Sequence, residues 1–156
     1  MIKRRGNVPR NFGRIDMIAA NEFILAYNGF FKEINRRYGK EGVAQLWEFF
    51  KESYCQKLDD YIRRDGLKGM YDYWTEVLHA EGGRYHLTLR EDEFVLDMHF
   101  CPSVGKLTNT PVKIYKDYCG HCPTLYSPVI QKYGFKVDYY ILERNKGECR
   151  IHVRKE

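Results

Sequence analysis

The hydrophobic periodicity of this chain changes once, at Gly83, and that change limits the possible folds more than any other feature. Before Gly83, apolar side chains recur every three or four residues, which is typical of one face of an α-helix. After Gly83, apolar and polar residues alternate, as in a β-strand with one buried face. Helices followed by strands predict an α+β fold rather than alternating βα units.

Three helices are expected before Gly83, over residues 15–38, 41–64 and 67–79. Gly39 and Gly66 end the first two, because glycine readily adopts the left-handed backbone that follows a helix. Together these helices form a predicted helical part, residues 15–82. The first helix carries an apolar stripe that we expect to face the core: Ile15, Ala19, Phe23, Ala26, Tyr27, Phe30, Phe31, Ile34 and Tyr38.

Four strands are expected after Gly83, in a sheet part that spans residues 84–154. Hairpin connections predict a mainly antiparallel sheet on which the helices pack. Between the second and third strands we expect a loop over 102–112 and a short helix over 112–119. A further short helix would begin at Pro123 or Pro128, with Cys122 or Ser127 as its cap.

The composition indicates a single globular domain, with 156 residues, 44% hydrophobic residues and 30% charged residues. Residues 1–14 contain basic residues and no acidic one, which predicts a basic, flexible leader before one domain at 15–156. Outside the leader, basic and acidic residues are equal in number, which argues against nucleic acid as a partner. No apolar run reaches transmembrane length and none follows the basic start, which predicts a cytoplasmic protein with no membrane partner.

Cysteine and histidine are concentrated around Gly120. Cys119, His121 and Cys122 lie within four positions, just before Pro123. A cysteine attacks as its thiolate, and the thiol pKa falls near a helix N-terminus or a cationic histidine. Cys119 and Cys122 are therefore candidate nucleophiles and His121 is a candidate base, while backbone N–H groups around Gly120 are candidates for an oxyanion hole.

A second candidate group ends the second predicted strand. Alternation along that strand places Asp97, His99 and Cys101 on one face, opposite its apolar residues. Cys101 is expected in a polar cleft, and Cys101 and Cys119 are the two leading candidate nucleophiles. His99 is a candidate base, and Asp97 a candidate residue to orient His99. Cys149, in the last strand, shares its face with apolar residues and is expected to point into the core.

Metal binding is an alternative interpretation of the same residues. Cys119 and Cys122, together with His99 and Cys101, supply three thiolates and one imidazole, which form a sensible zinc set. The cofactor prediction is accordingly either none or zinc. A redox role for the Cys-x-x-Cys pair is a third interpretation, although no βαβ unit accompanies it.

Several short segments of the C-terminal half carry a family resemblance: His99-Phe100-Cys101-Pro102, Tyr118-Cys119-Gly120-His121-Cys122, Tyr133-Gly134, Leu142-Glu143-Arg144 and Gly147-Glu148-Cys149-Arg150-Ile151. In these segments the chain resembles the L-2-amino-thiazoline-4-carboxylic acid hydrolase family. The helical part, with its Tyr38-Gly39-x-Glu41-Gly42 segment, is compatible with that family. The closing pattern, a glutamate followed by Gly147-x-Cys149-x-Ile151, also resembles the vinyl-reductase-type small-molecule-binding domain (V4R).

The first resemblance implies a hydrolase that opens a C–N bond of a small cyclic substrate, such as an aminothiazoline carboxylate. Cys101, Cys119 and Cys149 stand where the family's recurrent cysteines fall. The second resemblance implies instead a non-catalytic sensor that binds a small molecule or a metal. In both cases the expected partner is a small molecule, and a homo-oligomer is compatible with either.

Overall fold

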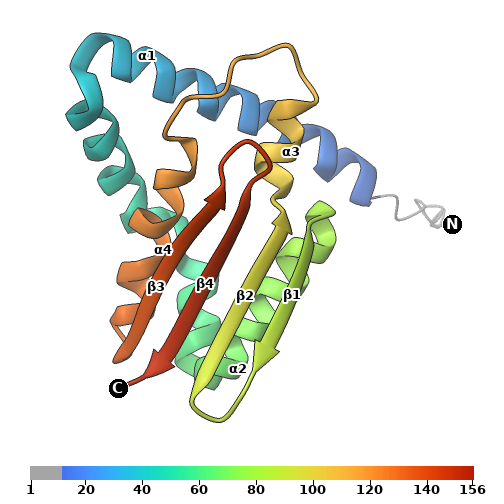
Figure 1. Cartoon of the computed structure of the whole chain (residues 1–156), viewed down its shortest axis with the longest axis vertical. Helices are drawn as coiled ribbons and strands as arrows, with labels where there is room; N and C mark the ends of the chain where they lie inside the picture. The colour runs from blue at the N-terminus through green and yellow to red at the C-terminus, as the bar shows by residue number, and fades with distance from the viewer. Residues whose placement is uncertain (1–11) are drawn as a thin grey trace, which may run out of the picture.

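The computed structural model describes the backbone of residues 12–156 and the side chains of residues 21–156 other than Glu52 and Tyr54. Residues 1–11, most of the predicted leader, lie outside that range, whereas residues 12–14 belong to the first helix. Figure 1 shows the arrangement of the elements. In chain order they are α1 (Phe12–Tyr54), α2 (Gln56–Glu81), β1 (Arg84–Leu89), β2 (Glu93–Phe100), α3 (Pro102–Thr108), the 3₁₀ turn η1 (Tyr118–Gly120), α4 (His121–Gln131), β3 (Phe135–Glu143) and β4 (Glu148–Lys155).

Glycine interrupts both long helices where the sequence predicts. Gly39 in α1 has φ 69° and Gly66 in α2 has φ 56°, backbone angles that other residues rarely adopt. The predicted helix over 41–64 is wrong in one respect, because the chain breaks at Cys55. Cys55 is buried, and its thiol donates a hydrogen bond to the carbonyl of Leu125, 3.3 Å away. Packing against α4 therefore accompanies a break that no local signal marks.

The four strands form an antiparallel sheet in the order β1-β2-β4-β3, which confirms the predicted α+β fold. Alternation along β2 buries Phe94, Leu96 and Met98, while Asp97 and His99 face the other way. Figure 1 shows α2 and α4 behind the sheet and α1 crossing its upper end. The face of the sheet that carries Asp97 is not covered by a described helix.

Buried residues form two apolar clusters that meet. The sheet core joins α2 and α4 to the inner face of the sheet, and the α1 core joins α1 to α3 and the segment before α4. Cys101 packs against both clusters. The sheet core comprises Leu58, Ile62, Leu67, Met70, Tyr73, Trp74, Leu78, Phe94, Leu96, Met98, Ile130, Ile151 and Val153. The α1 core comprises Ile24, Tyr27, Phe31, Val43, Trp47, Val104, Leu107, Tyr115 and Tyr118.

The apolar stripe predicted for the first helix is only partly buried over the described side chains, which do not include Ile15 and Ala19. Tyr27 and Phe31 belong to the α1 core, but Phe23, Phe30 and Tyr38 are 52%, 58% and 65% exposed. The stripe is wider than the surface that α3 and α4 offer to α1. Helical spacing alone does not show how much of an apolar face the rest of the fold covers.

The segment between β2 and β3 differs most from expectation. Residues 102–108 form α3 rather than a loop, because Pro102 sits in the first turn, where its missing N–H is not needed. Residues 112–117 are irregular rather than helical, and only the single turn η1 precedes α4. Helix α4 begins at His121, so neither Cys122 nor Ser127 caps it, and Pro128 lies within it.

Replacing Gly69 tests the close approach between the two halves of α2. An alanine Cβ at Gly69 would lie 1.9 Å from the backbone carbonyl oxygen of Tyr61, and a backbone atom cannot move aside as a side chain can. We expect Gly69→Ala to lower the free energy of unfolding by about 3 kcal/mol. Gly29→Ala is the matched control, since nothing lies within 4 Å of a Cβ there. It should be neutral or stabilise by about 0.5 kcal/mol in urea unfolding; equal effects of the two variants would contradict the packing.

Candidate functional site

Four cysteines converge where the two apolar cores meet. Cys101 precedes α3, Cys119 lies in η1, Cys122 lies in the first turn of α4, and Cys149 lies in β4 beside Met98. Each remains half-buried and reduced. Burial raises the pKa of Cys122, and the neighbouring thiols of Cys101, Cys149 and Cys119 raise it further. The fold thus gathers thiols from three separate segments of the chain into one neighbourhood.

Local backbone rules place two of these segments. Pro102 ends β2 and begins α3, so Cys101 turns out of the strand with φ −72° and ψ 123°. The β3–β4 turn then packs on Cys101 through Gly147, whose φ is 66°. A Cβ at Gly147 would lie 2.5 Å from the Cβ of Cys101 and 2.9 Å from that of Val104, so only glycine fits between the turn and α3.

His121 is held as a neutral imidazole of defined tautomer. Its Nδ1 contacts the backbone carbonyl oxygen of Tyr118, which can only accept, so Nδ1 carries the proton. Its Nε2 therefore presents a lone pair to the Sγ of Cys122, 3.4 Å away. The rings of Tyr27, Phe31 and Tyr118 surround the imidazole at centroid distances of 5.7, 5.9 and 4.9 Å. Burial lowers the pKa of His121 to about 4.

The thiols are also neutral near pH 7. Burial raises the pKa of Cys119 to about 11, with Cys101 adding to the rise and Arg144 opposing it. Burial raises the pKa of Cys149 to about 12. It also raises the pKa of Cys101, against the opposing effect of the backbone N–H groups at the start of α3. At rest the site is a set of protonated thiols beside an uncharged histidine.

A small cavity lies at Cys119. It has a volume of about 70 Å³, and its lining includes Tyr118, Cys119, Lys116 and Arg144. The Nη1 of Arg144 is 3.1 Å from the Oδ1 of Asp117, which holds the guanidinium in place. The cavity therefore combines a thiol with two cations.

The hydroxyl of Tyr139, in β3, has no hydrogen-bond partner among the described residues although it is buried. Burial raises its pKa well above the ordinary value, and the thiols of Cys122 and Cys149 contribute to that rise. A buried hydroxyl without a partner costs about 1–3 kcal/mol. Tyr139 is thus a spare donor beside the thiol–histidine pair.

The structure does not join the second predicted group to the first. Asp97 and His99 lie on the uncovered face of the sheet, where the Nε of Arg150 donates to Asp97 at 2.6 Å. Asp97 therefore pairs with Arg150 across the strands, and no contact between Asp97 and His99 is described. Cys101 does not share their face, because the strand ends at Phe100 and the alternation stops with it.

The predicted effect of the helix dipole on Cys122 is wrong. Cys122 does lie in the first turn of α4, where the dipole favours a thiolate. Burial outweighs this effect, so the pKa of Cys122 rises. The proposed zinc set is not assembled either: among the described residues, no group of three or more His, Cys, Asp or Glu side chains is placed to hold a metal ion.

Sequence reasoning missed Tyr118, Tyr139 and Arg144 as members of this site. Tyr118 contributes its backbone carbonyl, which leaves no trace in residue type. Tyr139 reads as one apolar position of a strand, and Arg144 as part of a hairpin turn. The only signal was the position of Arg144 in a turn that ends close to Cys149 in the sequence.

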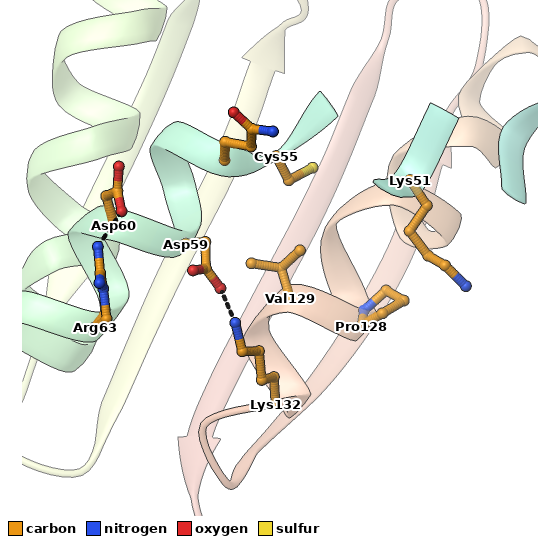
Figure 2. Close-up of a pocket in the computed structure, with 9 residues that line it drawn as sticks. Lys51, Cys55, Asp59, Asp60, Arg63, Pro128, Val129 and Lys132 are labelled. Carbon is orange, nitrogen blue, oxygen red and sulfur yellow. Dashed lines mark hydrogen bonds and ion pairs between the residues drawn. The ribbon is translucent and has the colours of Figure 1, made fainter. Parts of the chain in front are cut away.

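A larger groove, shown in Figure 2, lies between α2 and α4 beside the break at Cys55. It has a volume of about 530 Å³ and is lined by residues of α1, α2 and α4, including Cys55. Burial raises the pKa of Cys55 to about 12, so its thiol is inert. The Nζ of Lys132 pairs with Asp59 at 2.8 Å, as the dashed line in Figure 2 marks. The charges of this groove compensate one another, and we assign it no chemistry.

Comparison with known proteins identifies no relative. No family model matches the chain, and no curated protein matches it either. No helix in the described part of the chain is long and apolar enough to cross a membrane. The case for a function therefore rests on the geometry of the site.

Alkylation by iodoacetamide tests the neutral state of the thiols. With a pKa of about 11, only about one in ten thousand Cys119 side chains is a thiolate at pH 7. We expect the rate of Cys119 labelling, followed by mass mapping, to rise about tenfold per pH unit from pH 7 to pH 9. Glutathione, with an ordinary thiol, is the control for the reagent. A plateau below pH 8 would show that Cys119 is an activated thiolate.

The low pKa of His121 predicts how stability depends on pH. Between pH 6.5 and about 4 the unfolded chain binds a proton at this histidine and the folded protein does not. Stability attributable to His121 is therefore complete above pH 6.5, falls as the pH falls, and levels off below about 4. The total is on the order of 3 kcal/mol. Urea unfolding of the protein and of His121→Gln at pH 5.0–6.5 should show a shallower slope in the variant; equal slopes would refute the assignment.

Proposed function

We propose that this protein is a hydrolase that opens a C–N bond of a small cyclic substrate such as an aminothiazoline carboxylate, with Cys122 as nucleophile and His121 as base. The observation that carries the proposal is the fixed tautomer of His121. Because the carbonyl of Tyr118 holds the Nδ1 proton, the Nε2 lone pair faces the thiol of Cys122 at 3.4 Å. A nucleophile beside a base that a third group orients is the arrangement that covalent catalysis requires.

The neutral pair sets the order of proton transfers. Sulfur bonds to the electrophilic ring carbon of the substrate while the Cys122 proton moves to Nε2 of His121. The ring C–N bond then breaks, and His121 returns that proton to the leaving nitrogen. Water then attacks the same carbon while Nε2 of His121 takes a proton from it. The Sγ of Cys122 leaves and takes that proton back from His121. The net change is addition of one water to the substrate, and both residues return to their starting state.

Neighbouring groups supply the remaining requirements of this reaction. The spare hydroxyl of Tyr139 donates to the atom of the substrate on which negative charge develops, which also relieves its unpaired state. Arg144 and Lys116, which line the cavity at Cys119, attract the substrate carboxylate to the neighbourhood of the thiols. The family resemblance of the cysteine motifs supports the same substrate class.

Single substitutions test these roles. Turnover of 2-aminothiazoline-4-carboxylate should fall about a thousandfold or more in Cys122→Ser and about a hundredfold in Tyr139→Phe. Cys149→Ala is the control: it removes a thiol that packs on the sheet core, so it should lower stability by about 1 kcal/mol yet keep turnover. Acid-quenched enzyme should carry the substrate mass on Cys122. Full activity of Cys122→Ser, or an adduct on Cys119, would disprove the assignment.

A non-catalytic small-molecule-binding module is the second candidate. The raised pKa values of the thiols favour it, because no thiolate stands ready to attack. A protein of this class would bind the aminothiazoline carboxylate in calorimetry without turning it over, and Cys122→Ser would bind it equally well. Binding without turnover by the unaltered protein would decide for this candidate.

A further inference from the structure

A second groove lies between α1 and the irregular segment Lys113–Lys116, separate from the thiol site. Its volume is about 620 Å³, within the usual range of small-molecule sites. Ile114 and Tyr115 form its apolar lining, and Gly29 leaves open space where another residue would place a side chain. Four basic residues complete the lining: Lys32, Arg36, Lys113 and Lys116.

A buried asparagine fixes this groove. Asn28 is fully buried in α1, and its Nδ2 donates to the carbonyl oxygen of Lys113 at 3.2 Å. Its Oδ1 accepts from the backbone N–H of Tyr115 at 2.8 Å. The hydroxyl of Tyr115 in turn donates to the Oδ1 of Asn35 at 3.3 Å. Burying an amide is unfavourable unless its hydrogen bonds are made, so these bonds hold the segment in one register against α1.

The groove carries positive charge that the described residues do not compensate. Its one carboxylate, Glu33, is already engaged by Arg36 at 2.8 Å and by Arg37 at 2.5 Å. Lys32, Lys113 and Lys116 are exposed and form no ion pair within the described part of the chain.

The groove of Figure 2 provides the contrast within the same molecule. There Lys132 pairs with Asp59, Arg63 with Asp60, and Lys51 with Glu48 of α1. Two grooves of similar volume thus differ in whether their cations have partners. Unpaired cations that a buried hydrogen-bond network holds together are suited to an anion from solution.

We propose that the groove binds a small organic anion that carries phosphate, with the phosphate oxygens at Lys32, Lys113 and Lys116 and the organic part against Ile114 and Tyr115. Lysine ammonium groups are common phosphate ligands, and the apolar lining favours a phosphate ester over inorganic phosphate. An extended polyanion is disfavoured, because basic and acidic residues are equal in number over residues 15–156 as a whole. This inference does not depend on the thiol site.

Isothermal titration calorimetry of the chain, residues 1–156, with ATP tests the proposal. A second titration, with inorganic triphosphate, shows whether the organic part of the ligand contributes to binding. We expect saturable binding of ATP below about 1 mM, weakened by added KCl. The double variant Lys32→Gln/Lys113→Gln should bind at least about tenfold more weakly. Because this variant keeps the basic residues of the leader, the loss would be assigned to the groove.

Two matched variants and one competing ligand complete the test. Lys132→Gln, which removes a paired lysine of the other groove, and Cys122→Ser should bind ATP as the unaltered protein does. No binding of ATP at about 1 mM, or equal binding by the double variant, would overturn the proposal. Tighter binding of a single-stranded RNA 20-mer than of ATP, lost in the same double variant, would also overturn it and assign the surface to nucleic acid. Thermal unfolding of each variant confirms that it is folded.

Discussion

The sheet core and the α1 core meet at Cys101, and the positions of the other thiols depend on that contact. Pro102 turns the chain there, and Gly147 lets the β3–β4 turn close over it at a distance that no side chain would allow. Because α3 and this turn are tied together, the thiols of β4 and α4 come to lie beside those of α3 and η1. The candidate site is therefore a consequence of how the cores join.

Burial decides the electrostatics of that site. A helix N-terminus stabilises an adjacent negative charge by about 0.3–1 kcal/mol, which corresponds to less than one pKa unit. Removing a thiolate from water opposes it by several units at a buried position. Cys122 and His121 are therefore both neutral, despite the helix start and the short distance between them. Chemistry at such a pair begins with proton transfer during attack rather than with a preformed thiolate.

Helix α1 supports both proposed sites. Its aromatic residues Tyr27 and Phe31 surround His121, while Asn28, the next residue after Tyr27, holds the segment that forms the basic groove. Two adjacent residues of one helix therefore serve the two sites: Tyr27 packs against His121, and Asn28 hydrogen-bonds the segment of the basic groove. Ile114, Tyr115 and Lys116 line both the basic groove and the thiol cavity, so the two sites share a wall and one of its lysines.

Hydrophobic periodicity and the positions of glycine predict most of the secondary structure. The four strands, the antiparallel hairpins and the helix interruptions at Gly39 and Gly66 all follow from neighbours a few residues apart. The same local reasoning also located the stretch that holds Cys119, His121 and Cys122. It failed for residues 102–119, where a proline start and a buried asparagine 85 residues from its partner decide the path of the chain.

Which residues of the candidate site meet depends on packing between segments that are far apart in the chain. Strand alternation grouped Cys101 with Asp97 and His99, but the strand ends at Phe100, and the chain then carries Cys101 into the interior. The state of each thiol was likewise beyond the sequence, because a pKa depends on how many protein atoms replace water around the sulfur. Long-range packing sets that number, and no spacing of residues along the chain encodes it.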